Sequence, residues 1–289
     1  MNLSTPPFVD HFAALVSDYD VVLCDVWGVV HNGVAAYPEA GDALTRFRRR
    51  GGTVVLVSNS PRPGVPVTRQ LDQLGVVRTA YDGVVTSGDV TRGVLAERPG
   101  ANVFHIGPAR DLPIFDGLAI RFTSLEVADC VVCSGLFNDD TETAEDYREL
   151  LGGLRARGLL MVCANPDVVV ERGDHLVYCA GAIADLYRSL GGEVIYAGKP
   201  YRRIYDLAIG ECAALRGGRI DLKRVLAIGD SVRTDFRGAL GIGVDCLFVT
   251  GGIHAEELGG SHEPDMGALG AMFASAGSLP RAVTRRLVW

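Results

Sequence analysis

The chain has 289 residues and a formal net charge of −7, which allows about two domains and excludes binding to nucleic acid or an anionic membrane through a basic field. Apolar residues make up 48% and charged residues 22%, as in globular proteins with a sizeable core. The N-terminus lacks the basic head and apolar stretch of a signal peptide, and no apolar run reaches the roughly 18 residues of a membrane span. We therefore expect a cytoplasmic protein without a nucleic-acid or membrane partner.

Short apolar runs alternate with helix-like stretches, a pattern typical of α/β proteins with a mostly parallel sheet. Near-continuous apolar character indicates strands that are buried on both faces. The clearest such runs are Val21–Cys24, Val54–Val57, Val194–Ala197, Val225–Ile228 and Cys246–Val249. Helical stretches are expected at Ala40–Arg50, Pro66–Leu74, Ile204–Leu215 and Thr234–Leu240. The sequence therefore predicts a doubly wound, Rossmann-like parallel sheet.

A long insertion separates the second of these strands from the third. About 130 residues lie between them, far more than one crossover helix requires. The insertion has strand-like runs of its own at Val103–Ile106, Cys130–Cys133, Leu160–Cys163 and Leu176–Tyr178, and a helical stretch at Glu142–Arg157. We expect an inserted α/β cap domain over residues 84–182 and a core domain formed by residues 1–83 and 183–289.

Seven cysteines are scattered along the chain, an odd number that does not suggest a disulfide framework. Cys130 and Cys133 have CxxC spacing, but they lie in a strand-like run, where residues three apart point to opposite faces. The pattern favours buried thiols over a metal or redox site.

Polar residues follow four of the predicted strands at the point where each ends. Asp25 follows the first strand, Ser58 and Asn59 the second, Lys199 the third and Asp230 the fourth. Ligands of an open parallel sheet bind at the carboxyl ends of its strands. The sequence therefore predicts a polar site at one edge of the sheet.

These segments resemble, in order, the four motifs of the haloacid dehalogenase-like superfamily. The motif segments are Asp25–Val30 (DVWGVV), Ser58-Asn59, Gly198-Lys199-Pro200, and Gly229-Asp230-Ser231 with Asp235. The insertion point, His31-Asn32-Gly33 and Ala164–Asp167 (ANPD) resemble the class IIA branch, which includes nitrophenyl phosphatases and pyridoxal phosphate phosphatase. The resemblance spans about residues 18–252. It implies a hydrolase, specifically a phosphatase, acting on a phosphorylated small molecule.

The resemblance also implies how the site works. Asp25 is the expected nucleophile, which forms an aspartyl-phosphate. Mg²⁺ is the expected cofactor because two anions must be brought together, with Asp25, Asp230 and the backbone carbonyl of Trp27 as ligands. Asp235 is expected in an outer-shell role or as a direct ligand. For Asp230 and Asp235 the alternative is helix N-capping.

Phosphate binding is expected to fall to the second and third motifs. The turn Ser58-Asn59-Ser60 offers hydroxyl and backbone donors to the phosphoryl oxygens, and Lys199 offers a positive charge. The alternatives are ordinary turn chemistry for the Ser58–Ser60 segment and a solvated surface charge for Lys199.

Trp27 departs from the pattern, because phosphatases of this superfamily normally carry a second Asp there as the general acid–base. An indole cannot exchange a proton at neutral pH. In one interpretation another group does this work, and His31 is the nearest titratable candidate, although it also fits a neutral loop histidine. In a second, the leaving group needs no protonation. In a third, the site binds a phosphorylated ligand with little or no turnover, in a regulatory protein.

The cap is expected to set substrate specificity. Asn165 and Asp167 follow a predicted strand end, with Asp174 and His175 shortly after, and the resemblance implies that this region recognises the non-phosphate part of the substrate. Asn-Pro-Asp is equally a strong turn sequence. The resemblance further suggests a homodimer formed through the cap.

Overall fold

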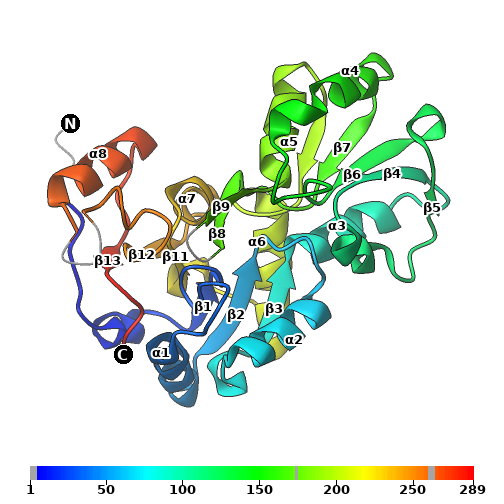
Figure 1. Cartoon of the computed structure of the whole chain (residues 1–289). Coiled ribbons are helices and arrows are strands. Elements are labelled where there is room, and N and C mark those ends of the chain that lie inside the picture. Colours follow the sequence, from blue (N-terminus) through cyan, green and yellow to red (C-terminus); the bar gives the residue numbers. More distant parts are fainter. Residues whose placement is uncertain (1–4, 173–174, 260–263) are drawn as a thin grey trace. The chain divides into compact units, whose positions relative to one another are not determined.

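The computed structural model describes residues 5–172, 175–259 and 264–289. The chain forms two compact units, each described by itself. The first unit comprises Met1–Ser58, Thr68–Val85 and Tyr205–Trp289, and the second comprises Asn59–Val67 and Thr86–Ile204. Figure 1 gives the element labels used below.

A six-stranded sheet forms the core of the first unit. Its central strand β1 (Val21–Cys24) pairs in parallel with β2 (Thr53–Ser58) on one side and β11 (Val225–Gly229) on the other. Outside these lie β3 (Gly83–Thr86) next to β2, and β12 (Asp245–Val249) followed by β13 (Ala282–Thr284) next to β11. The register places Cys24 beside Ile228. The residues that follow β1 and β11 therefore emerge next to each other.

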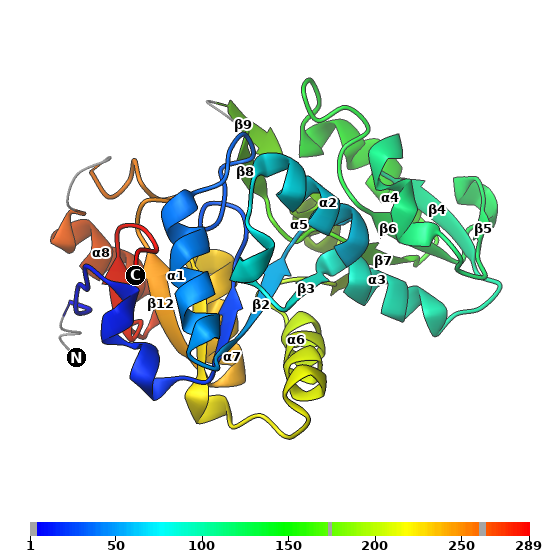
Figure 2. The ribbon, with the colours of Figure 1, turned by 90° about the horizontal axis from the view of Figure 1, so that it is seen from below.

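The helix that follows β1 buries one apolar stripe. In α1 (Pro38–Arg49) the buried residues include Ala40, Leu44 and Phe47, at the i, i+4, i+7 spacing of one helix face. The other helices of the unit are α2 (Gly64–Leu74) and α6 (Arg202–Arg216), each of which begins in the second unit, α7 (Arg237–Ile242) and α8 (Met266–Ala276). Both views show α8 beside the β12–β13 edge (Figure 1, Figure 2), where Phe273 contacts Phe248 edge-on with ring centroids 5.1 Å apart.

A five-stranded parallel sheet forms the core of the second unit, in the order β10-β7-β6-β4-β5. Its strands are β4 (Asn102–Ile106), β5 (Arg121–Phe122), β6 (Cys130–Cys133), β7 (Leu160–Cys163) and β10 (Val194–Tyr196). The helices are α3 (Ser87–Ala96), α4 (Arg148–Ala156) and α5 (Ala180–Ser189), and β8 (Val169–Arg172) pairs antiparallel with β9 (His175–Tyr178).

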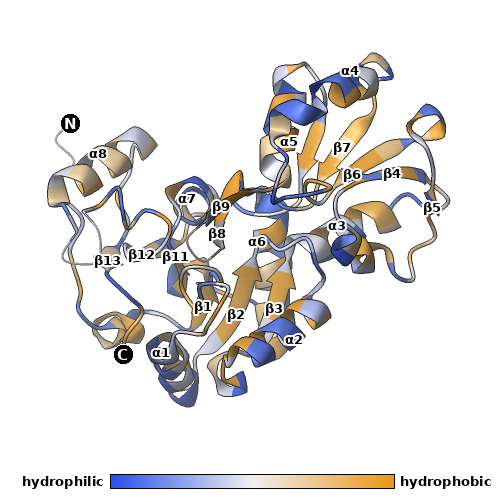
Figure 3. Cartoon of the chain, in the orientation of Figure 1, coloured by the Kyte–Doolittle hydropathy of each residue, from blue (hydrophilic) through white to orange (hydrophobic). Residues whose placement is uncertain are grey.

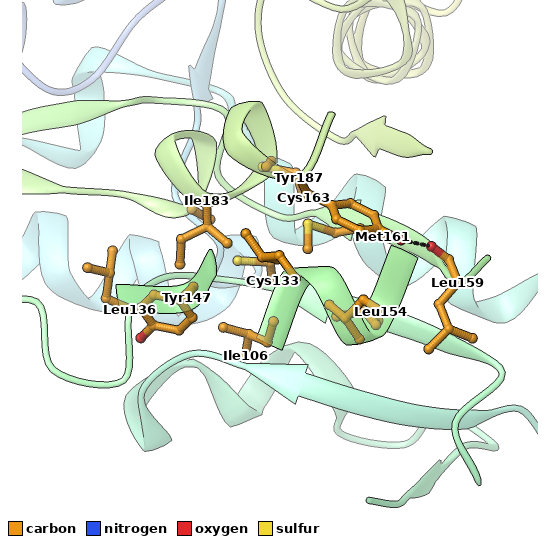
Figure 4. Close-up of a cluster of buried hydrophobic side chains, with 14 of the residues drawn as sticks. Ile106, Cys133, Leu136, Tyr147, Leu154, Leu159, Met161, Cys163, Ile183 and Tyr187 are labelled. Atoms are coloured by element: carbon orange, nitrogen blue, oxygen red, sulfur yellow. Dashed lines mark hydrogen bonds between the residues drawn. The ribbon is translucent and has the colours of Figure 1, made fainter. Parts of the chain in front are cut away.

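Both faces of this second sheet are covered, as the alternation along β6 shows. Val131 and Cys133 pack into a cluster with residues of α4 and α5, whereas Cys130 and Val132 pack into another with residues of α3. Figure 4 shows the first cluster, in which Tyr187 also donates a hydrogen bond to the carbonyl of Leu159 at 2.6 Å. Figure 3 shows the matching hydropathy, with strongly hydrophobic strands and mixed helices. The predicted doubly wound α/β fold is confirmed.

The cysteine prediction is confirmed as well. All seven thiols are free and buried. Burial raises the pKa of Cys133 to about 12, so this thiol is a poor metal ligand and a poor nucleophile at neutral pH.

One strand lies in a different sheet from the one expected. The run Val194–Ala197 was assigned to the core sheet, but β10 pairs in parallel with β7 through Tyr196 and Cys163. Residues 183–204, expected in the core domain, therefore belong to the second compact unit. An apolar strand does not specify its neighbour, which explains the misassignment. Across the described residues, no helix combines the length and the apolar character that a membrane span needs.

Candidate functional site

Three buried carboxylates converge at the carboxyl ends of neighbouring strands in the first unit. Asp25 follows β1, Asp230 follows β11, and Asp235 lies in a short π-helix (Val232–Phe236) just beyond. One carboxylate oxygen from each lies within 4.8 Å of the other two. Three anions this close, away from water, repel one another unless a cation lies between them. Oxygen-only ligands in this number suit a hard divalent cation such as Mg²⁺.

Close-packed backbone fixes the carboxylate of Asp230. Its Oδ2 accepts a hydrogen bond from the backbone N of Ile253 at 2.8 Å. A Cβ added at Gly28 or at Gly252 would lie only 1.9 Å from the same oxygen. Gly28 also has a φ of +85°, which favours glycine. Two segments therefore approach Asp230 closely because they carry no side chain at these points.

The helix-capping alternative for Asp230 is excluded, since the cap of the π-helix is Ser231, whose Oγ accepts from the backbone N of Thr234 at 3.3 Å. Asp235 turns back instead, and its Oδ2 accepts from the backbone N of Ser231 at 3.2 Å. A Cβ at Gly229 would lie 2.1 Å from Cγ of Asp235, so this glycine also makes room for a carboxylate.

Trp27 lies in the loop after Asp25, against His31. The two rings meet edge-on with centroids 5.1 Å apart. The buried Nε1 of Trp27 has no hydrogen-bond partner among the residues that the structure describes. His31 is only 3% exposed, and burial lowers its pKa to about 4. Its Nδ1 accepts from the backbone N of Gly33 at 2.9 Å. These features favour a neutral loop histidine over the acid–base role expected for His31.

The second unit holds Lys199, Asn59 and Asp167 together. Lys199 follows β10 and is 3% exposed, so it is not a solvated surface charge. Asn59 Oδ1 accepts from the backbone N of Lys199 at 2.7 Å, and its Nδ2 donates to Asp167 Oδ1 at 2.8 Å and to the carbonyl of Lys199 at 3.3 Å. Both N–H groups of the carboxamide are thus engaged by protein. The phosphate contact expected of Asn59 therefore stays a prediction for its backbone N–H, as part of the Ser58–Ser60 turn.

The remaining predicted residues divide between the two units. Ser58 ends β2 in the first unit, and Ser60 lies in the second, where its Oγ accepts from the backbone N of Arg62 at 3.3 Å. Asn165 Oδ1 accepts from the backbone N of Asp167 at 3.1 Å, which is the turn chemistry expected of Asn-Pro-Asp. Asp174 and the side chain of His175 lie outside the described part of the chain.

Gly252 and Ile253 were missed by sequence reasoning. They follow β12, at the same edge as Asp25 and Asp230. The Gly251-Gly252 pair, one residue after an apolar strand, is the signal that could have indicated close backbone approach.

Comparisons with known proteins agree with this geometry. A haloacid dehalogenase-like hydrolase family model matches residues 22–121, and a HAD-hydrolase-like model matches residues 196–268. A crystal structure of a haloacid dehalogenase-like hydrolase from Brucella suis is 47% identical, with a TM-score of 0.87, and the match covers 97% of this chain and 100% of that one.

Two curated relatives are phosphatases. The D-glycerol 3-phosphate phosphatase of Mycobacterium tuberculosis is 28% identical over 84% of this chain, which spans 66% of that protein's length. A crystal structure of that organism's glycerol phosphate phosphatase contains magnesium (26% identity, TM-score 0.64, covering 88% of this chain and 77% of that one). The acid sugar phosphatase of Staphylococcus saprophyticus is 25% identical over 84% of this chain and 90% of its own. The chain belongs to the haloacid dehalogenase-like hydrolase family.

Proposed function

We propose that this protein is a Mg²⁺-dependent phosphatase of a phosphorylated small molecule and that it works through an aspartyl-phosphate on Asp25. The observation that carries the proposal is the convergence of Asp25, Asp230 and Asp235, three buried carboxylates within 4.8 Å of one another. Packing alone gives no reason to bury three anions together.

The residues present fit the expected metal. Asp25, Asp230 and the backbone carbonyl of Trp27 would hold Mg²⁺, with Asp235 as a further ligand or as a support behind them. When bound, the ion would supply positive charge between the nucleophile and the phosphoryl oxygens. The close approach of Gly28 and Gly252 to Asp230 fixes the carboxylate in advance, as a metal ligand requires.

In the first step an oxygen of Asp25 forms a bond to phosphorus, and the bond from phosphorus to the leaving oxygen breaks. That oxygen departs with the electron pair. In the second step the oxygen of water forms a bond to phosphorus and gives one of its protons to solvent, the bond from phosphorus to the Asp25 oxygen breaks, and the carboxylate and inorganic phosphate are released. Lys199 is proposed to neutralise the phosphoryl charge, and the Ser58–Ser60 turn to donate hydrogen bonds to its oxygens.

Trp27 decides which substrates suit this site. Within the first unit, the groups identified near Asp25 include two carboxylates that a metal would keep ionised, the indole of Trp27 and the neutral His31. None of them readily protonates a leaving alkoxide, a contribution worth about 10²–10⁴ in rate. Substrates whose leaving group departs as a stable anion, such as acyl or aryl phosphates, should therefore react fastest.

The names of the relatives indicate a broad class of substrate. Their names refer to glycerol phosphate and sugar phosphates, so we propose a small phosphorylated metabolite as the natural substrate. The cap predicted at residues 84–182 is proposed to recognise its non-phosphate part, with Asn165 and Asp167 as candidate contacts.

The test is a Mg²⁺-supplemented screen of aryl, acyl and alkyl phosphates with the wild type and with Asp25→Asn. We expect release of phosphate from aryl and acyl phosphates, at least about 10²-fold faster than from alkyl phosphates, and none with the variant. Equal rates on the two classes would refute the account of Trp27.

A second candidate function is favoured by the same tryptophan: a regulatory protein that binds a phosphorylated ligand without turning it over. This alternative predicts Mg²⁺-dependent binding by calorimetry, no phosphate release across the panel, and little loss of affinity in Asp25→Asn.

A further inference from the structure

The carboxamide of Asn59 makes four hydrogen bonds, the full number that two N–H donors and one carbonyl oxygen with two lone pairs allow. Besides its bonds to Lys199 and Asp167, its Oδ1 accepts from the hydroxyl of Ser87 at 3.4 Å. Asn59 and Ser87 are both buried. A buried, fully satisfied amide holds its partners in one arrangement, because breaking any bond would leave a polar group unpaired.

These partners come from segments that are far apart in the sequence. Asn59 is the first residue of the second unit, Ser87 begins α3, Asp167 follows β7, and Lys199 follows β10. A Cβ at Gly198 would lie 2.0 Å from Ser87 Oγ and 2.3 Å from Asn59 Oδ1. The chain before Lys199 therefore approaches the amide as closely as only glycine permits.

Asn59 engages both the N–H and the carbonyl of Lys199. Holding the donor and the acceptor of one residue fixes the peptide planes on both sides of its Cα. The direction in which the Lys199 side chain leaves the backbone is thereby fixed too.

We propose that Asn59 is a positioning residue, which aims the ammonium of Lys199 and locks it to the Asn165–Asp167 turn as one rigid element. Asp167 then acts through Asn59, as the acceptor that orients the amide. The proposal rests on the proposed function, because the value of aiming Lys199 is its charge on the phosphoryl group.

The experiment exchanges the two ends of the Asn59–Asp167 bond. Asn59→Asp removes both donors and sets a second carboxylate beside that of Asp167, whereas Asp167→Asn keeps an acceptor, because its amide can turn its oxygen toward Asn59. The double variant Asn59→Asp/Asp167→Asn restores a donor–acceptor pair with reversed roles. Asn138→Asp is the matched control, since Asn138 is exposed and its side-chain Oδ1 accepts a local bond from the backbone N of Asp140 at 3.1 Å.

The measurements are kcat/KM on 4-nitrophenyl phosphate with Mg²⁺, the inhibition constant of inorganic phosphate, and Tm. We expect Asn59→Asp to lose about 10–100-fold in kcat/KM and to bind phosphate correspondingly more weakly. Asp167→Asn should keep the inhibition constant of inorganic phosphate within about threefold of wild type, because phosphate has no further part for residue 167 to contact. The double variant should regain only the share of the loss that comes from the Asn59–Asp167 bond, because an Asp at position 59 still cannot donate to the carbonyl of Lys199. The inhibition constant does not depend on how much enzyme is folded, so a merely structural role would leave it unchanged.

An Asn59→Asp enzyme that is folded and keeps the wild-type phosphate inhibition constant would overturn the proposal, as would a double variant no better than the single one. If Asn59→Asp does not fold, Asp167→Ala provides the same test, because it removes the acceptor and should weaken phosphate inhibition. A wild type without turnover would instead count against the proposed function. Phosphate affinity by calorimetry would then still compare Asn59→Asp with Asp167→Asn.

Discussion

Replacing Gly252 by alanine should disable the metal site through a single methyl group. The added Cβ would lie 1.9 Å from Oδ2 of Asp230 and 2.4 Å from its Cβ. Rotating the carboxylate alone does not relieve both contacts, so Asp230 must retreat by roughly 1 Å or more to reach ordinary van der Waals separation. Ile253 would have to move with it, or its N–H would lose the acceptor that it has at 2.8 Å.

Mg²⁺ tolerates such a displacement poorly, since it requires near-octahedral oxygens at about 2.0–2.1 Å. We expect Gly252→Ala to weaken Mg²⁺ binding by about 10–100-fold, equivalent to about 1.4–2.7 kcal/mol. At saturating Mg²⁺ much of the activity should return, because the nucleophile Asp25 itself is unchanged.

The assay is a Mg²⁺ titration of 4-nitrophenyl phosphate hydrolysis, paired with a calorimetric titration of the metal alone. Gly241→Ala is the matched control: it lies in α7, and a Cβ there would meet nothing within 4 Å. The control should bind Mg²⁺ as the wild type does. A Gly252→Ala protein with unchanged Mg²⁺ affinity would refute the assignment of Asp230 as a ligand.

Three further outcomes are expected. Trp27→Asp should raise the ratio of glycerol 3-phosphate to 4-nitrophenyl phosphate hydrolysis by about tenfold or more, measured by phosphate release; an unchanged ratio would contradict the missing-acid account. Burial lowers the pKa of His105 to about 4, so below the ordinary pKa of histidine the unfolded chain binds more protons than the folded one, and the free energy of unfolding falls as pH falls. Between pH 7.5 and 5.5 the free energy of unfolding, measured by urea titration, should fall by about 1 kcal/mol more in wild type than in His105→Gln. Burial raises the pKa of Asp111, which contributes with the opposite sign, but this carboxyl is present in both proteins and its contribution drops out of the comparison. Because all seven cysteines are buried, a thiol reagent should label none in the native protein and all seven in urea.

The sequence indicated the strand ends well because burial on both faces leaves a strong signal. The predicted run Val21–Cys24 coincides with β1, and Val225–Ile228 lies within β11. The strand β3 and the helices α3 and α5 were not predicted. In α3 the glycines Gly88 and Gly93 weaken the helical signal, and the segment forms nonetheless because a capping box between Thr86 and Asp89 starts it.

Within the site, sequence reasoning found residue types and missed contacts. The motif order identified the three carboxylates that the structure brings together. It could not show that the side-chain amide of Asn59 is hydrogen-bonded to Lys199 and Asp167, since those bonds join segments 108 to 140 residues apart. Nor could it show that burial would leave His31 neutral. Both outcomes depend on tertiary packing, which no local pattern encodes.

The loop after Asp25 packs around the indole of Trp27, so this residue has a structural role in addition to replacing the general acid. A Cβ at Gly33 would lie 2.5 Å from Cζ2 of Trp27, and Gly33 has a φ of +85°. The same glycine donates its N–H to His31, whose backbone carbonyl in turn accepts from the backbone N of Gly28 at 2.7 Å. The indole, the neutral imidazole and the two glycines are therefore mutually dependent. The metal would need only the backbone carbonyl at this position, which leaves the side chain free to make the loop rigid. A rigid loop with no proton to give suits a substrate whose leaving group needs none.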